Sequence, residues 1–213
     1  MVDRTVKAYD KELDALARRI VEMGGISEKM VVDAMDALAN ADATLAHQVV
    51  GTDPRLDALQ REIEEQAVLT IARRQPVAAD LREIIGAIRA AGDLERVGDL
   101  AKNIAKRSVK IGLAARVPRA IVGLRHMNDV ATELLKDVLD AFAQRDVERA
   151  RAVWERDVEL DALEDSVFRD LLTHMMEDPE IVFYLITGSS LPAERPKGRH
   201  EYEADAKASP TRL

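Results

Sequence analysis

Pairs of carboxylates stand four residues apart at several places in this chain, a spacing that puts both side chains of a pair on one face of a helix. Three of these pairs are candidate metal ligands: Asp53 with Asp57, Glu95 with Asp99, and Asp157 with Asp161. Because like charges at this spacing repel each other, their recurrence predicts a shared cation. Two pairs from neighbouring helices would form an all-oxygen site, and we expect Fe, Mn or Mg there, with the identity of the metal open.

The same residues have a plainer interpretation as ion pairs and helix caps. Glu95 and Asp99 would then pair with Lys102, Arg96 or a facing helix. Asp53 precedes a proline, which is typical of a residue that caps a helix N-terminus. The sequence alone leaves the metal site and the ordinary ion-pair network open as alternatives.

Other residue types add little catalytic chemistry. None of the four histidines stands in the Glu-x-x-His pattern of di-iron bundles, and the chain has no cysteine for zinc thiolates or nucleophiles. Phosphate-loop, nucleophile-elbow and zinc-protease motifs are also missing from the sequence. We therefore expect a binding protein that is not an enzyme. The alternative is a carboxylate-bridged metalloenzyme in a helical bundle, and a third hypothesis is a structural bundle with solubilising acidic pairs.

Composition and charge narrow the class of protein. The 213 residues are 47% hydrophobic but only 3% aromatic, which is typical of a helical bundle. A formal charge of −8 argues against nucleic acid and anionic membrane surfaces as partners. The N-terminal residues contain no apolar signal core, and no apolar run reaches the roughly 18 residues that a membrane span needs. We expect a cytoplasmic protein without membrane insertion.

The chain contains an internal repeat. A shift of 104 positions places Asp42 on Asp146, Asp53 on Asp157, and the run LDAL at 56–59 on the same run at 160–163. Such a duplication predicts an all-α fold of two up-down three-helix bundles in tandem. In the first unit, helical periodicity covers residues 9–40, 43–74 and 76–111, with Pro54 kinking or interrupting the second helix. The second unit supplies helices over residues 118–144 and 147–177.

The third helix of the first unit has the most informative pattern. Its apolar stripe begins at Leu81 and Ile85 and ends in the carboxylates described above. Gly86, Gly92 and Gly98 lie inside this otherwise strong helix and each costs about 1 kcal/mol relative to Ala. These glycines predict that another helix or a ligand approaches the backbone closely.

The second unit lacks most of its third helix. Residues 76–112 span about 36 positions in the first unit, whereas the equivalent residues 179–188 span about 9. The missing segment of about 27 residues corresponds to about 40 Å of helix, and it is either deleted near Pro179 or omitted from the given sequence. We expect three regions: a first bundle at 1–114, a truncated second bundle at 115–188, and a disordered tail at 189–213.

Four runs of the chain resemble the PhoU family of phosphate regulators. They are RQPVAADLREIIGAIRAAGDLERVGDLAKNIAKR at 74–107, YDKELDALARRIVEMGGISEKMVVDAMDALANAD at 9–42, LDALEDSVFRDLLTHMMEDP at 160–179, and FYLITG at 183–188. The resemblance covers roughly residues 5–188. It implies two three-helix bundles, a cytoplasmic location, and a homodimer or higher oligomer. It also implies negative regulation of phosphate-starvation signalling, through a phosphate-sensing histidine kinase and the ATPase subunit of the phosphate ABC transporter.

The family resemblance also implies metal clusters bound by Glu/Asp-x-x-x-Asp motifs. Glu95 with Asp99 matches this motif directly, and the pairs that begin at Asp53 and Asp157 match it too. The chain departs from the family pattern because it has no second copy of the DLERVGD-type helix. Asp157 and Asp161 therefore lose their expected partner ligands. We expect residues 5–112 to form a self-sufficient bundle, and the second unit to need helices from another copy.

Overall fold

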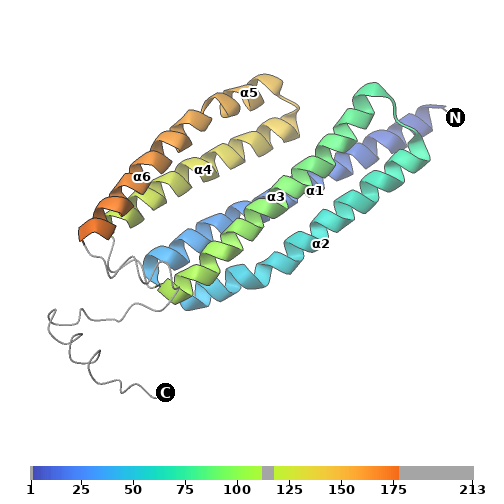
Figure 1. Cartoon of the computed structure of the whole chain (residues 1–213). Coiled ribbons are helices and arrows are strands. Elements are labelled where there is room, and N and C mark those ends of the chain that lie inside the picture. Colours follow the sequence, from blue (N-terminus) through green and yellow to red (C-terminus); the bar gives the residue numbers. More distant parts are fainter. Residues whose placement is uncertain (1, 112–117, 178–213) are drawn as a thin grey trace, which may run out of the picture.

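The computed structural model describes residues 2–111 and 118–177, and every element in these ranges is a helix (Figure 1). The prediction of an all-α fold is confirmed. In chain order the helices are α1 (Val2–Asn40), α2 (Ala43–Arg74), α3 (Ala78–Ile111), α4 (Pro118–Gln144), α5 (Val147–Glu155) and α6 (Asp157–Glu177). No helix in this described part of the chain is both long and apolar enough to cross a membrane.

Helices α1, α2 and α3 lie beside one another in alternating directions and share one apolar core (Figure 1). Fully buried side chains come from all three helices: Ile20 and Met23 from α1, Leu56 and Ile63 from α2, and Ile84 from α3. The predicted first-unit helices match the structure within two residues at most boundaries. However, α3 begins at Ala78, so residue 76 belongs to the connection and not to a first helical turn.

Helix α2 is continuous through Pro54, so the prediction that this proline interrupts the helix is wrong. Val49, five residues before the proline, and Leu56, two residues after it, are both buried in the shared core. Their packing stabilises the helical course despite the missing backbone N–H. Asp53 consequently lies inside the helix and caps nothing; the N-cap of α2 is Asp42, which accepts from Leu45 N.

The internal repeat is visible in how the second helix of each unit begins. Ala41 and Arg145 both have left-handed backbone, with φ of 53° and 55°. The residue that follows each of them caps the next helix through its carboxylate, Asp42 for α2 and Asp146 for α5. Asp146 accepts from Arg149 N at 3.0 Å, the same distance as the equivalent bond in the first unit. The aligned aspartates therefore perform the same structural task.

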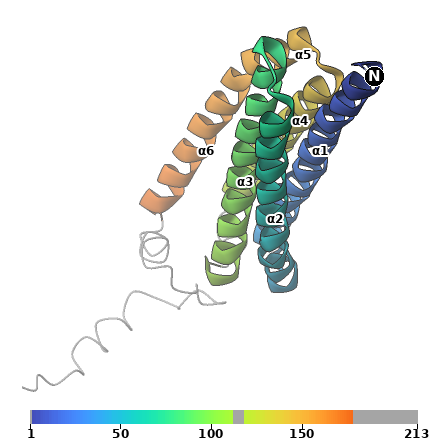
Figure 2. The ribbon, with the colours of Figure 1, turned by 90° about the vertical axis from the view of Figure 1, so that its right-hand side faces the viewer.

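Helix α4 lies along α1, and α5 and α6 pack on α4 (Figure 2). The contact between α1 and α4 is close: a Cβ added at Gly24 would lie 2.4 Å from Leu139 Cδ1. Gly123 allows an equally close approach of α6, since an added Cβ would lie 2.8 Å from Val167 Cγ2. The second unit is thus attached to the first through its first helix.

The predicted helix over 147–177 is divided at Arg156, between α5 and α6. The guanidinium of Arg156 pairs with Glu133 of α4 at 3.0 Å and with Glu159 at 3.2 Å. No residue of α5 is buried, so packing does not hold the two segments in one line as it does in α2. Asp157 consequently stands in the first turn of α6, where its charge is favourable toward the helix dipole.

The described part of the second unit has a small core. Five apolar residues of α4–α6 are buried, against twenty in α1–α3. The five are Ala120, Ile121, Leu134, Ala141 and Val167. Residues 179–188, which are equivalent to the third helix of the first unit, and the predicted tail at 189–213 lie outside the described residues.

Candidate acidic site on the first bundle

The structure brings four of the six predicted site residues together at the contact between α2 and α3. Asp53 and Asp57 come from α2, and Glu95 and Asp99 come from α3. The two helices approach closely here, because a Cβ added at Gly98 would lie 2.1 Å from Leu56 Cδ2. The expected close approach at a glycine is therefore confirmed at this position.

The other two glycines of α3 have no such role among the described residues. An added Cβ at Gly86 would meet nothing within 4 Å, and at Gly92 it would meet only Gln60 Nε2 at 4.0 Å. At these two positions no helix of the described chain approaches closely, and the alternative of a ligand there stays a prediction. Gly98 alone is explained by helix packing.

Lys102 links the two helices at the acidic cluster. Its ammonium donates to Asp53 Oδ2 at 2.8 Å and to Asp99 Oδ1. The Asp53 side chain is only 13% exposed, so this ion pair between α2 and α3 is largely shielded from water. The two hydrogen bonds raise the pKa of the Lys102 ammonium well above its usual value. Lys102 therefore remains charged at all physiological pH values.

The two carboxylates of α3 respond to the cluster in opposite ways. Burial raises the pKa of the Glu95 carboxyl, and the nearby charges of Asp99, Asp57 and Asp53 raise it further. The hydrogen bond from Lys102 instead lowers the pKa of Asp99. Ionisation of Glu95 is thus disfavoured in the folded chain, and a second cation would relieve that cost.

The carboxylate oxygens of the cluster are suitable ligands for a hard cation, but their present positions do not form a metal-binding site. Within the described ranges, no three His, Asp or Glu side chains are grouped so as to hold a metal ion. The ammonium of Lys102 lies between Asp53 and Asp99, where a shared cation would have to sit. A metal here stays a prediction, and it would have to displace Lys102. The ion-pair interpretation already accounts for Asp53, Asp99 and Lys102.

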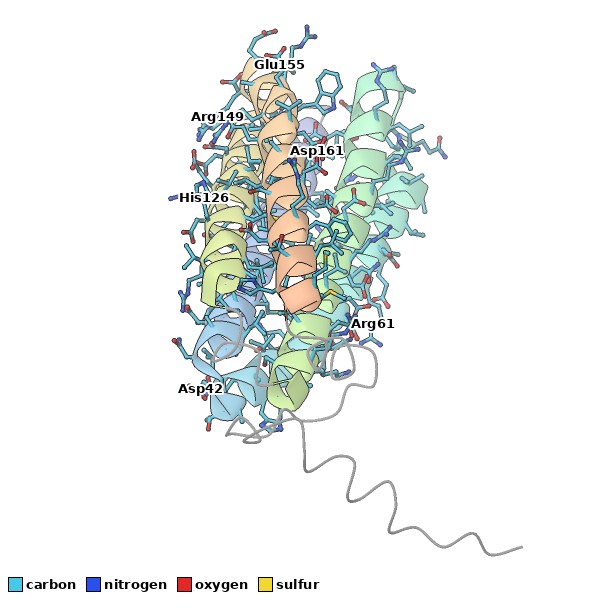
Figure 3. The ribbon with its side chains drawn as sticks, turned by 60° about the vertical axis from the view of Figure 1, so that its left-hand side comes forward. Asp42, Arg61, His126, Arg149, Glu155 and Asp161 are labelled. Carbon is cyan, nitrogen blue, oxygen red and sulfur yellow. The ribbon has the colours of Figure 1, made fainter. Side chains whose placement is uncertain are left out.

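The third predicted pair lies apart from this cluster. Asp157 and Asp161 are exposed in the first turns of α6, which packs on α4 (Figure 3). The described part of the second unit contains no counterpart of α3 that could bring further carboxylates to them. No histidine of this part joins a metal-holding group either, so the alternative of a carboxylate-bridged metalloenzyme gains no support from the geometry.

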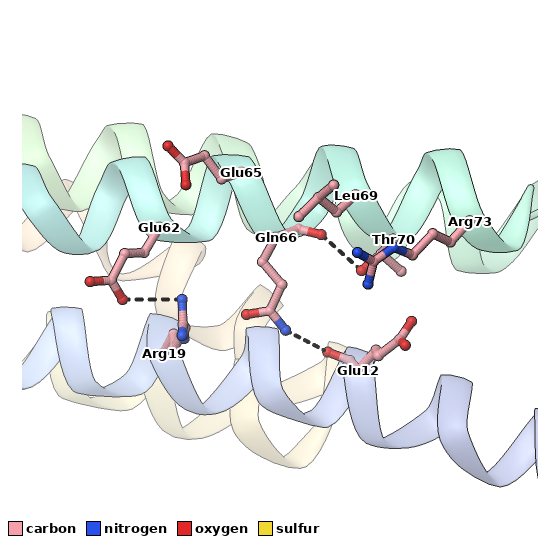
Figure 4. Close-up of a pocket in the computed structure, with 8 residues that line it drawn as sticks. All are labelled: Glu12, Arg19, Glu62, Glu65, Gln66, Leu69, Thr70 and Arg73. Carbon is pink, nitrogen blue, oxygen red and sulfur yellow. Dashed lines mark hydrogen bonds and ion pairs between the residues drawn. The ribbon is translucent and has the colours of Figure 1, made fainter.

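A polar cleft of about 400 Å³ lies between α1 and α2 (Figure 4). Two of its charged side chains bridge the helices: Arg19 pairs with Glu62 at 3.2 Å, and Glu12 pairs at 2.7 Å with Arg74, which lies beside the cleft. The bond from Arg74 holds the pKa of the Glu12 carboxyl below its usual value. No local spacing in the sequence could indicate these pairs, because their members are tens of residues apart. The cleft lies where two helices are joined by these ion pairs, and Glu65 and Arg73 also line it.

A protein-family model described as the PhoU domain matches residues 20–108 and 124–189. The chain belongs to the PhoU family. A phosphate-specific transport system accessory protein PhoU homolog from Rhizobium meliloti is 45% identical over 220 residues, which cover 90% of this chain and 92% of the relative. The homolog from Caulobacter vibrioides is 39% identical over 224 residues, covering 92% of this chain and 97% of the relative.

Two solved PhoU structures share the fold. The crystal structure of PhoU from Pseudomonas aeruginosa superposes with a TM-score of 0.78 at 37% identity, over 84% of this chain and 86% of that one. The phosphate transport system regulatory protein PhoU from Streptococcus pneumoniae gives 0.73 at 24% identity, over 84% and 87%. This second likeness, at lower identity, shows the fold alone.

The comparison with relatives also supports a missing segment. The 220 positions aligned with the Rhizobium meliloti homolog include 90% of the 213 residues here, about 192, so about 28 positions have no counterpart in this chain. This length agrees with the roughly 27 residues expected from the internal repeat. The second stretch matched by the family model, 124–189, is likewise shorter than the first, 20–108.

Proposed function

We propose that this chain regulates phosphate uptake and phosphate-starvation signalling as a binding adaptor without catalytic turnover. One observation carries the proposal: an accessory protein of phosphate-specific transport is 45% identical over most of both chains. The three-helix core of the first unit is also intact. The proposed partners are the ATPase subunit of the phosphate ABC transporter and a phosphate-sensing histidine kinase. With these partners the chain would act in the cytoplasm as a negative regulator of phosphate-starvation genes.

Complementation tests this proposal. We expect the chain to restore repression of phosphate-starvation genes in a bacterium that lacks its own PhoU, and to be captured by the purified ATPase subunit and by the kinase. Ile20→Asp, which places a charge in the buried core, is the control that abolishes the fold and the effect. Failure of the well-folded parent chain both to complement and to bind either partner contradicts the adaptor function.

We further propose that a metal ion competes with Lys102 for the acidic cluster of Asp53, Asp57, Glu95 and Asp99. The support is the like-charge repulsion that raises the pKa of Glu95. A bound metal would supply charge neutralisation between α2 and α3 and would stabilise the folded bundle by mass action.

Thermal melts with added Fe, Mn or Mg, and with a chelator, test the metal proposal. We expect the metal-dependent rise in melting temperature to grow in Lys102→Gln, which removes the competing ammonium. It should disappear in Glu95→Gln combined with Asp99→Asn. Asp157→Asn is the matched control, because this exposed residue lies on α6 outside the cluster. If the melting temperature responds to metal in neither the parent nor Lys102→Gln, the metal proposal is wrong and these residues form only ion pairs.

A further inference from the structure

Helix α2 gathers its exposed apolar surface in a single turn. Val68 and Leu69 are 60% and 49% exposed, and no other large apolar side chain of this helix, all of which is described, is exposed. Ala72 and Arg73 extend the same face, because each stands four residues further along the helix. Covering this turn with a partner's apolar side chains would remove apolar surface from water, which favours association.

The exposed turn borders two hollows of the surface. One is the polar cleft between α1 and α2 (Figure 4), and the other is a shallow, mostly apolar hollow of about 530 Å³. Glu65 and Leu69 line both hollows. A partner that lies across Leu69 can therefore place side chains in both hollows at once.

The charged residues that line the two hollows are mostly acidic. They are Glu12, Glu62, Glu64, Glu65, Arg19 and Arg73. Glu12 and Glu62 already pair with arginines of the facing helix. Glu64 accepts a hydrogen bond from Gln60 Nε2 at 3.2 Å, but within the described ranges neither Glu64 nor Glu65 pairs with a cation. These two carboxylates leave a negative charge beside the apolar turn, and a basic partner would neutralise it.

The described helices of the second unit leave this face of α2 open. Helix α4 packs on α1, and α5 and α6 pack on α4, away from α2 (Figure 1). The open face runs over residues 62–73, which is about 18 Å of helix. A helix of about three turns matches this length, and apolar side chains on one of its faces match the hollows.

We propose that residues 62–73 of α2 form a docking surface for a basic amphipathic helix of a partner protein. The apolar side chains of that helix fill the hollows on either side of Leu69, and its Lys or Arg side chains pair with Glu64 and Glu65. The inference rests on the proposed adaptor function, since an adaptor needs a surface that a partner can cover.

Two segments of the chain itself are poorer occupants of this surface. The apolar run at 181–188 contains no Lys or Arg, so it cannot neutralise the two carboxylates. Helix α6 of a second copy exposes apolar side chains, but Asp161 and Asp165 lie exposed on the same helix. Its approach would bring like charges together, which opposes binding.

Titration of a labelled peptide with the full chain tests the proposal. The probe is a helical peptide of about 18 residues that has leucines along one face and lysines elsewhere. Fluorescence anisotropy should show a dissociation constant in the micromolar range. A peptide with glutamate in place of each lysine should bind at least about tenfold more weakly. Added salt should weaken binding of the lysine peptide, because part of the attraction is between exposed charges.

Matched pairs of variants locate the peptide on α2. Val68→Gln should weaken binding of the lysine peptide at least about fivefold, whereas Val122→Gln, at a valine of α4 that is equally exposed, should not. Glu65→Lys should weaken binding at least about tenfold, whereas Glu155→Lys on α5 should not. All four positions are exposed, so circular dichroism should show unchanged helix content.

Three results of these measurements would overturn the proposal. The first is a lysine peptide that does not bind, or that binds no better than the glutamate peptide. The second is a control variant that weakens binding as much as its partner on α2. The third is a change in the sedimenting mass of Val68→Gln relative to the parent, which would make this face a contact between copies of the chain.

Capture by the purified ATPase subunit and by the histidine kinase separates this inference from the adaptor function. Val68→Gln combined with Glu65→Lys should weaken the binding of at least one of these partners by at least about tenfold. Binding of both partners as tight as that of the parent would overturn the docking surface. A parent chain that binds neither partner would contradict the adaptor function, and the peptide titration would then decide the docking surface alone.

Discussion

The two units of this chain begin their second helices in the same way yet have very different cores. Asp42 and Asp146 make equivalent capping bonds at 3.0 Å. Behind these caps, α1–α3 bury twenty apolar residues and α4–α6 bury five in the described ranges. Local capping therefore fixes where a helix starts, whereas the number of packed helices decides how much apolar surface leaves water.

The second helices of the units show what this difference does to local structure. Helix α2 contains Pro54 and remains continuous, because buried residues on both sides of the proline pack against α1 and α3. The equivalent segment of the second unit contains no proline and still divides at Arg156. In the first unit, burial of apolar side chains thus outweighs the low helix propensity of proline. In the second unit, α5 buries no residue, so local backbone preferences decide where the helix ends.

The largest expected effect contrasts one buried leucine in each unit. Leu56→Ala should lower the free energy of unfolding by about 4 kcal/mol, since Leu56 is fully buried and fills the contact at Gly98. Leu134→Ala should cost about 2 kcal/mol, because only five apolar residues of α4–α6 are buried and the small core around Leu134 can close more of the cavity. Urea denaturation measures both values, and an equal or larger loss in Leu134→Ala would contradict the difference between the cores.

The next effect concerns two glycines of α3. Gly98→Ala should destabilise the chain by about 1–3 kcal/mol, because its Cβ would lie 2.1 Å from Leu56 Cδ2. Gly92→Ala should stabilise it by about 1 kcal/mol, since alanine is the better helix former and the site has room. Thermal melts of the pair should shift in opposite directions. Shifts of the same sign would show that α2 and α3 do not approach as described.

The equivalent N-caps should respond differently to the same change. Asp42→Ala should lower the global free energy of unfolding by about 1 kcal/mol, because α2 is part of the main core. Asp146→Ala should instead release α5 locally, because α5 has no buried residue. Amide exchange combined with denaturation separates global from local effects. A fully global loss in Asp146→Ala would mean that the second unit unfolds together with the first.

The smallest effect depends on pH and on Glu95. Its pKa is higher in the folded chain than its ordinary value of 4.5, so the folded state binds more protons and stability falls as pH rises through this window. Glu95→Gln removes that loss and should raise the melting temperature at pH 7 by about 1–2 °C. At pH 4 the gain should shrink. Asp161→Asn on α6 is the control, and a similar gain there would place the repulsion outside the cluster.

Much of the fold could be predicted from the sequence because its signals are local or repeated. Helical periodicity located the helices of the first unit within two residues at every boundary except the start of α1, which was predicted at residue 9 and lies at Val2, and the 104-residue repeat paired Asp42 with Asp146. The break at Arg156 could not be predicted, because it depends on the burial that α5 fails to achieve. The cleft pair of Arg74 with Glu12 is likewise a tertiary contact without a spacing signal.

The candidate site was predictable only in part. Acidic spacing placed Asp53, Asp57, Glu95 and Asp99 on faces that do meet. Spacing could not decide whether a metal or the ammonium of Lys102 lies among them, because that depends on the path of one long side chain. Asp157 and Asp161 match the same motif, yet a motif needs a facing helix before its members can form a site.

Amide hydrogen exchange tests most directly whether the second unit depends on outside cover. In a preparation in which the chain is monomeric, amides buried in α2 should exchange only through global unfolding. Amides of α5 and α6 should exchange through local openings of much lower free energy, because these helices pack almost entirely on α4 and contribute one buried residue, Val167. Equal protection of α2 and α6 in the monomeric chain would contradict the account.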